Sequence, residues 1–269
     1  MFVDSHCHLS FPELHGRIDS IRAEMAAAEV DRALCICTTL EEFSVVHALA
    51  MAYDNFWCSV GVHPDNEGVQ EPSLQDLVQR AALPRVVAIG ETGLDYYRLN
   101  GRSVAEMAWQ RDRFGTHIRA ARATGLPLVV HTRSASADTL AILREEGAGQ
   151  VRGVFHCFTE THEVAMAALE LGFHISFSGI ITFRNAADLR AVAQQVPLER
   201  CLIETDSPYL APMPFRGKPN HPALVVHVAR QLAALKGISI EALAEATSEN
   251  FERLFGVPTK RAVEYEKLL

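Results

Sequence analysis

The chain has 269 residues, of which 48% are hydrophobic and 22% are charged, so it can bury a large core. A single domain of roughly 250 residues is common for an α/β barrel, and the length therefore does not require a division. The formal net charge of −8 excludes a basic field over the whole surface, so any contact with nucleic acid would have to be local.

Short apolar segments recur along the chain and predict eight β-strands. They are residues 2–6, 34–38, 57–61, 86–90, 128–131, 153–156, 174–177 and 201–204. These segments are continuous apolar runs rather than alternating ones, which is typical of parallel strands that helices cover on the outside.

Stretches with a helical spacing of apolar residues lie between these strands. They are residues 17–29, 41–53, 103–124, 135–146, 160–171, 186–195 and 222–235, and two short C-terminal helices are expected at 241–246 and 248–255. A regular alternation of strand and helix at this length predicts a (β/α)8 TIM barrel with extra C-terminal helices. Because no linker or low-complexity segment interrupts the pattern, residues 1–269 are expected to form one domain.

Polar side chains follow the predicted strands at the end where barrel enzymes carry their chemistry. In the opening MFVDSHCHLS, His6 and His8 share one face of the first strand, because side chains alternate along a strand. From this stretch alone, two histidines that bind a shared ligand and two solvated histidines near a terminus are equally good explanations. Further histidines and acids end later strands, however: His63, Glu91, His131, His156, Glu204 and Asp206. Such a set on one rim favours a shared ligand over isolated structural roles.

The expected chemistry of this rim is metal binding. Imidazole nitrogens and carboxylate oxygens suit zinc, manganese and similar divalent ions. The set is larger than one tetrahedral ion needs, and a carboxylate between two ions can bridge them, so the pattern favours a two-metal hydrolytic centre.

Five motifs in this order resemble the TatD family of metal-dependent deoxyribonucleases within the amidohydrolase superfamily: HxH, GETGLDYY, HTR, FHCF and ETDSPYLAP. The resemblance covers roughly residues 1–255. It implies two divalent ions (magnesium, manganese or zinc) with Glu91 as the bridging ligand. The implied ligands are His6, His8, Glu91, His131, His156 and Asp206. The implied activity is hydrolysis of DNA phosphodiester bonds, in the family often as a 3′-to-5′ exonuclease.

The distribution of lysine is consistent with a glutamate bridge. Many two-metal amidohydrolase barrels bridge their ions with a carboxylated lysine, but residues 1–217 contain no lysine. A protein carboxylate must then form any bridge, and Glu91 is the candidate. A general preference for arginine would also explain the absence.

Substrate contacts are expected from His63, from Arg133 and from the loop PMPFRGKPNHP. Arg133 favours a phosphate, although a salt bridge between loops is the alternative. In the loop, the candidates are Arg216, Lys218 and Asn220. The family usually has RGKRNEP here, so Pro219 and His221 depart from its pattern and leave the role of Asn220 open. Tyr96 and Tyr97 either stack on a base or pack their loop.

The leading hypothesis is a nuclease that acts on single-stranded or frayed DNA ends through a metal-bound hydroxide. Asp206 would act as ligand and general base together with Glu91, and Glu204 would support a ligand. One alternative is hydrolysis of a carbonyl substrate, such as a D-aminoacyl-tRNA ester or a cyclic amide. Another is a metal-binding scaffold without turnover.

The expected setting is the cytoplasm, without a membrane or an obligate protein partner. The chain shows no pattern of a signal peptide and no run of about 18 apolar residues. Its six cysteines lie in apolar runs without a CxxC motif, which indicates buried free thiols in a reducing compartment.

Overall fold

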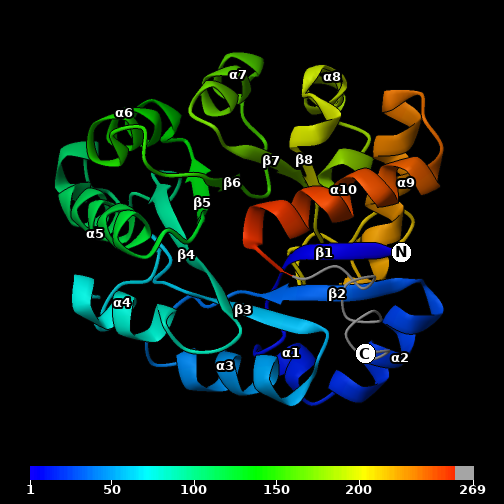
Figure 1. Ribbon diagram of the computed structural model, residues 1–269. Coiled ribbons are helices and arrows are strands. Elements are labelled where there is room, and N and C mark those ends of the chain that lie inside the picture. Colours follow the sequence, from blue (N-terminus) through cyan, green and yellow to red (C-terminus); the bar gives the residue numbers. More distant parts are fainter. Residues whose placement is uncertain (258–269) are drawn as a thin grey trace.

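Eight parallel strands form one sheet in the order β1 to β8, each next to its neighbour in sequence. The computed structural model describes residues 1–257 (Figure 1). The strands are β1 (Phe2–Cys7), β2 (Val30–Cys35), β3 (Phe56–Val60), β4 (Val86–Asp95), β5 (Leu128–Arg133), β6 (Gly153–Phe155), β7 (His174–Phe177) and β8 (Cys201–Ile203).

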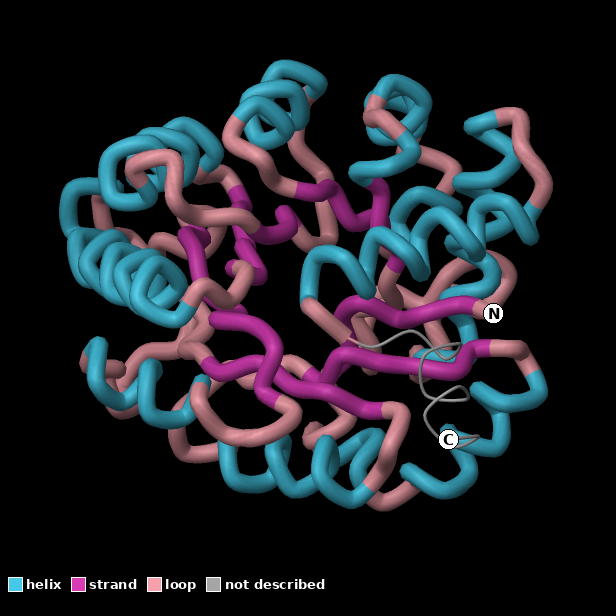
Figure 2. Tube along the Cα trace, in the orientation of Figure 1, coloured by secondary structure: helices cyan, strands magenta, loops and turns pink. Residues whose placement is uncertain are grey.

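Helices surround the strands and give the ring-like outline that Figure 2 shows. Those between strands are α1 (Pro12–His15), α2 (Ile18–Ala27), α3 (Phe43–Ala52), α4 (Leu74–Ala81), α5 (Ala108–Thr124), α6 (Ser136–Gly147), α7 (His162–Glu170) and α8 (Ala187–Gln195). After β8 come α9 (Val225–Lys236) and α10 (Ile240–Phe255). The predicted (β/α)8 barrel with extra C-terminal helices is confirmed.

The first and last strands meet just beyond β8. Cys7 forms a parallel bridge with Ser207, the backbone N–H of His8 donates to Ser207 O at 2.9 Å, and that of Asp206 donates to His6 O at 2.9 Å. The segments that carry His6, His8 and Asp206 are therefore fixed to one another by backbone hydrogen bonds.

Apolar side chains fill the opposite end of the barrel. Phe251, Leu254 and Phe255 of α10 pack with residues that β1 to β6 and β8 contribute, namely Val3, Leu34, Ile36, Trp57, Ala88, Val129, Val154 and Leu202. In Figure 1, α10 is the orange-red helix beside β1. Because α10 covers this end, the other end is left for the polar residues that follow the strands.

The structure differs from the expected elements in several places. Strand β2 spans Val30–Cys35 where residues 34–38 were expected, and the short helix α1 was not expected. Residues 241–255 form one helix rather than two, because the Thr247 hydroxyl bonds to Leu243 O inside the helix and the Ser248 hydroxyl bonds to Met1 O. The helix α4 was not expected, and it begins with a capping box formed by Ser73 and Asp76. Strand β4 continues to Asp95, beyond the expected end at Gly90.

Within residues 1–257, no single helix is both long and apolar enough to cross a membrane. The segments Pro222–Lys236 and Ile240–Phe255 reach the length and composition of a span only when taken together, and they are bent by 108°.

Candidate metal centre

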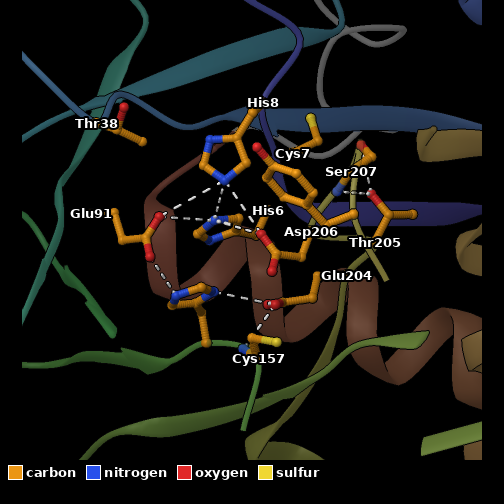
Figure 3. Close-up of polar contacts among 12 residues, drawn as sticks. His6, Cys7, His8, Thr38, Glu91, Cys157, Glu204, Thr205, Asp206 and Ser207 are labelled. Carbon is orange, nitrogen blue, oxygen red and sulfur yellow. Dashed lines mark hydrogen bonds and ion pairs between the residues drawn. The ribbon is translucent and has the colours of Figure 1, made fainter. Parts of the chain in front are cut away.

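Histidines and carboxylates from five strand ends converge at the open end of the barrel. His6 and His8 come from β1 and the residue after it, Glu91 from β4, His131 from β5, His156 directly after β6, and Asp206 from the segment after β8. Figure 3 shows the rings of His6 and His8 directed toward the carboxylates of Glu91 and Asp206. The structure thus brings together all six residues that the motifs implied as ligands.

The two oxygens of Glu91 face different histidines. Oε2 lies 3.3 Å from His6 Nε2 and 3.9 Å from His8 Nε2. Oε1 lies 3.2 Å from His131 Nδ1 and 2.8 Å from His156 Nε2. A buried carboxylate between two groups of nitrogens has the arrangement that a bridging ligand needs.

Asp206 completes the group on the Oε2 side. Its Oδ1 lies 3.3 Å from His8 Nε2 and 3.6 Å from His6 Nε2, and these two nitrogens are 3.2 Å apart. The residue has a φ of 54°, in the left-handed region that is uncommon for non-glycine residues and is often found at functional sites. Three atoms from two chain segments, the end of β1 and the residues after β8, thus lie close together.

Two further carboxylates orient the histidines on the Oε1 side. His131 Nε2 donates to Asp95 Oδ2 at 3.0 Å, and His156 Nδ1 donates to Glu204 Oε1 at 3.3 Å. Such partners fix the tautomer of a ligating histidine. Glu204 was the expected support, whereas Asp95 was missed. The signal was present, because Asp95 lies four residues after Glu91 and so shares its face of an extended strand.

Gly93 allows β4 to lie close to β5 at this point. A Cβ atom on Gly93 would lie 1.9 Å from the carbonyl oxygen of His131, and its φ of +134° is also unfavourable for other residues. The glycine of the GETGLD motif therefore brings Asp95 within reach of the His131 ring.

The electrostatics keep the central carboxylates ionised. Burial opposes ionisation of Glu91, but the electrostatic effect of the surrounding His156, His63 and His6 outweighs it and holds the pKa of this carboxyl well below its usual range. Burial likewise opposes ionisation of Asp206, yet its hydrogen bond with His8 and the nearby histidines lower its pKa. Ionised carboxylates are the form that binds cations.

The donor set fits divalent ions. When His131 and His156 are neutral and donate to their carboxylates, the nitrogens that face Glu91 carry lone pairs. Lone pairs of nitrogen and oxygen at 2.8–3.2 Å require a proton or a cation between them. His156 Nε2 is also a buried atom without a hydrogen-bond partner. Three overlapping groups are close enough to hold an ion: His6–His156–Asp206, His6–His8–Glu91 and His63–Glu91–His131.

His63 belongs to one of these groups, but its hydrogen bonds favour another role. The backbone N–H of Asp65 donates to His63 Nδ1 at 3.0 Å, so a neutral ring carries its proton on Nε2. That nitrogen lies 3.2 Å from Glu91 Oε1. A protonated nitrogen donates a hydrogen bond and does not bind a metal.

Helix α5 holds the segment that carries His63. The N–H of Val62 donates to His117 Nε2 at 3.0 Å, and the Arg113 guanidinium donates to the carbonyl oxygens of His63 and Asn66, both at 2.8 Å. His117 and Arg113 are buried and lie one helical turn apart. His117 therefore supports the His63 segment from α5.

The other expected substrate contacts lie in different surroundings. Arg133 is exposed and lines a cavity of about 680 Å³ together with five of the six implied ligands, all except His6. Its guanidinium lies 3.7 Å from the centroid of the Tyr97 ring. Arg216 lies 4.3 Å above the Phe183 ring. Lys218 lines a separate and larger cavity of about 1380 Å³ between α2, α9 and α10, which contains none of the converging ligands.

Asn220 is buried, and its amide group is fully engaged within the protein. Its Nδ2 donates to the carbonyl oxygens of Thr205 at 2.9 Å and Tyr209 at 2.6 Å, and its Oδ1 accepts from the N–H of His221 at 3.0 Å. This geometry favours a role in holding the loop after β8 over a contact with substrate.

Comparisons with known proteins agree with the motifs. A family model described as TatD related DNase matches residues 3–256. The chain is 49% identical over 263 residues to the uncharacterized metal-dependent hydrolase YcfH of Escherichia coli K12, covering 96% of this chain and 97% of that protein. It is 35% identical to the 3′-5′ ssDNA/RNA exonuclease TatD of Citrobacter rodentium, covering 91% of this chain and 94% of that protein.

A solved structure gives the same result. The TatD homolog YjjV from Escherichia coli K12 superimposes with a TM-score of 0.88 at 30% identity, covering 96% of this chain and 98% of that one. The matches extend over nearly the whole chain, and the resemblance inferred from the motifs is confirmed. With its histidines and carboxylates gathered at one end of the barrel, the chain belongs to the TatD-related DNase family and is a metal-dependent hydrolase.

Proposed function

We propose that this protein is a deoxyribonuclease that cleaves phosphodiester bonds from DNA ends, in the 3′-to-5′ direction, at a centre for two divalent ions. The proposal rests mainly on the two carboxylate oxygens of Glu91, which face different pairs of histidines. Oε2 faces His6 and His8, and Oε1 faces His131 and His156. The family description and the name of the Citrobacter rodentium relative support a nucleic-acid substrate.

The ligands divide into two sets in this proposal. His6, His8 and Asp206 would hold one ion and His131 and His156 the other, with one oxygen of Glu91 facing each set. Magnesium, manganese and zinc all suit such nitrogen and oxygen donors. When bound, a pair of ions lowers the pKa of water and neutralises charge on the phosphoryl oxygens.

Asp206 is the group best placed to orient a water molecule and take its proton. Its side chain is 16% exposed, compared with 3% for Glu91, and its pKa is lowered despite burial because His8, with Nε2 at 3.3 Å, and other histidines lie beside it. It is therefore ionised at neutral pH and reaches the cavity, as a general base requires.

His63 and Arg133 bind the phosphate. The Nε2–H of His63 points into the centre and can donate to a phosphoryl oxygen. The exposed guanidinium of Arg133 lines the same cavity and suits a phosphate with its planar set of donors. Asp95 and Glu204 keep the His131 and His156 rings in their ligating tautomers.

We also propose a cytoplasmic location. All six cysteines are free, and five of them are buried, as is usual in a reducing compartment.

The test is a substrate panel with controlled metals. Metal is first removed from the protein with a chelator, and Mg²⁺, Mn²⁺ or Zn²⁺ is then added back. Each preparation is assayed with single-stranded DNA labelled at either end, blunt duplex DNA, a D-aminoacyl-tRNA and a cyclic amide. We expect metal-dependent release of nucleotides from the 3′ end of the single strand. The Asp206→Asn variant, purified in parallel, controls for contaminating nucleases. Hydrolysis of only a carbonyl substrate would overturn the proposal.

A further inference from the structure

Two aromatic residues follow the ligands of β1 and β8 in equivalent turns. Phe11 comes three residues after His8, and its N–H donates to His8 O at 3.1 Å. Tyr209 comes three residues after Asp206, and its N–H donates to Asp206 O, also at 3.1 Å. Each ring is therefore tied by the backbone to a ligand, and both rings line the cavity of the metal centre.

The position of Tyr209 is fixed by its neighbours. Asn220 Nδ2 donates to Tyr209 O, and the hydrogen bonds between the His8 and Asp206 segments hold the two turns together. The Phe11 ring meets the Tyr209 ring edge-on, with centroids 6.3 Å apart and an interplanar angle of 72°. A rigid aromatic surface of this kind binds a ligand with little loss of conformational entropy.

Phe11 and Tyr209 differ in what their faces contact. Phe11 stacks on the His8 ring, with centroids 4.7 Å apart and an interplanar angle of 20°. One face of the Phe11 ring is therefore occupied by His8. Tyr209 is 54% exposed although it lines the cavity. An exposed aromatic side chain at the mouth of a polar site indicates a surface for a planar ligand.

The two tyrosines after Glu91 are less available. Tyr96 is buried, and its hydroxyl donates to Asp138 at 2.8 Å and accepts from Arg111 at 3.0 Å, so it packs its loop. Tyr97 is 60% exposed, but the Arg133 guanidinium covers one face of its ring at 3.7 Å. Of these three tyrosines, Tyr209 offers the freest ring face beside the ligands.

We propose that Tyr209, supported edge-on by Phe11, stacks on one unpaired base adjacent to the scissile phosphate and so selects single-stranded ends. This inference rests on the proposed nuclease function and deepens it. Any base presents an aromatic face, so such stacking tolerates all sequences. A base inside a duplex has both faces covered by its neighbours, and it must leave the stack before it can contact Tyr209.

The cavity has polar and aromatic groups in suitable places for this substrate. Tyr209 lies on the side of β1 and β8, and Arg133 lies at the end of β5, with Glu91 and Asp206 also in the lining. A scissile phosphate bound at the metal centre would thus have the Tyr209 ring on one side. On the other side, the Arg133 guanidinium would be available to a neighbouring phosphate.

The test compares dithymidine phosphate with two analogues in which a tetrahydrofuran residue replaces either the 5′ or the 3′ nucleoside. For the unaltered protein, loss of the stacked base should lower kcat/KM by roughly 5- to 150-fold, the range expected for one base on an aromatic ring. Loss of the other base should have a smaller effect, and the difference identifies the nucleoside that stacks.

Variants then assign the effect to Tyr209. Tyr209→Ala should lower kcat/KM for dithymidine phosphate to the level of the affected analogue and leave that analogue unchanged. Tyr209→Phe should keep the preference, because the ring is retained. Met51→Ala is a matched control, since Met51 is also 54% exposed but lies on α3 outside the cavity. Quenching of a dinucleotide that contains 2-aminopurine gives a readout of stacking without turnover.

Each outcome decides one point. If Tyr209→Ala lowers kcat/KM equally for all three probes, or if base removal has no effect on the unaltered protein, the stacking role is wrong and the nuclease proposal stands. If no probe is hydrolysed with any added metal, the proposed function is wrong and the stacking role is lost with it.

Discussion

The four histidines of the centre are oriented by two different means. His131 and His156 each donate to a carboxylate on the side away from Glu91. Among residues 1–257, Nδ1 of His6 and of His8 has no hydrogen-bond partner, and ring contacts orient these side chains instead. His6 stacks on His156 with centroids 3.9 Å apart, and His8 on Phe11 with centroids 4.7 Å apart. Substitution of a residue that orients one of these histidines should therefore affect metal binding mainly on that histidine's side of Glu91.

The proposed bridging role of Glu91 predicts a loss of metal in a charge-neutral variant. Glu91→Gln keeps the size of the side chain but removes the charge between the two groups of histidines. We expect at least one ion to be lost and the activity to fall by more than about 100-fold, because even supporting residues of metal ligands cost 10- to 100-fold. Metal analysis of the purified protein and nuclease rates measure this. Full metal content with normal turnover would refute the bridge.

The contact between Asp95 and His131 predicts a smaller effect on one side only. In Asp95→Asn, the amide can donate to His131 Nε2 and stabilise the tautomer with its proton on Nδ1, the nitrogen that faces Glu91. That tautomer does not bind a metal, so metal affinity should fall by about 10- to 100-fold.

Titration with a competing chelator measures this change in affinity. The matched variant Glu204→Gln should act in the same way through His156. Unchanged affinity in both variants would show that these carboxylates do not orient the ligands.

At the level of elements, the support of the His63 segment by α5 predicts a pH dependence of stability. Burial lowers the pKa of His117 to about 4, and the charge of Arg113 acts in the same direction. Protonation of Nε2 would also remove the acceptor of the hydrogen bond from Val62 N–H. The unfolded chain has the ordinary value of about 6.5, so the stabilisation is complete above pH 6.5 and is lost as the pH falls toward 4. The size of this contribution is at most about 3 kcal/mol.

Denaturant unfolding at several pH values separates this contribution from others. His117→Gln should be less stable than the unaltered protein at pH 7, and the difference should shrink as the pH falls to 4. His15→Gln is the control, since His15 is exposed on α1. A difference that does not change with pH would contradict the role of His117.

The sequence predicted the number and order of the strands well and the contacts between elements poorly. Continuous apolar runs followed by His6, Glu91, His131 or Asp206 mark the strands, because a barrel buries both faces of each strand and keeps its polar groups at one end. The extension of β4 to Asp95 was not predicted, since it depends on pairing with Arg133 of β5. Likewise, the sequence shows Asn220 only as a polar residue in a loop. Its hydrogen bonds to two backbone carbonyl groups depend on how that loop folds.

For the whole molecule, charge restricts how it can meet a polyanion. The net charge of −8 repels DNA at long range, so under the proposed function affinity would have to come from a few contacts near the centre. The structure supports Arg133 for this role because it lines the cavity, whereas Lys218 lines the separate one between α2, α9 and α10. Each contact with a phosphate of a single strand adds about 0.7 to the magnitude of the slope of log K, where K is the binding constant, against log[salt].

Few contacts therefore predict a shallow salt dependence. We expect log K for a short single strand to fall against log[salt] with a slope of roughly −1 to −2, measured with Asp206→Asn at a fixed metal concentration. Adding Arg133→Ala should weaken binding and reduce the magnitude of the slope by about 0.7, while metal content stays unchanged. Arg230→Ala is the control, since Arg230 is exposed on α9 beside the separate cavity. A slope steeper than about −4 would reveal an extended basic surface and place the DNA elsewhere on the protein.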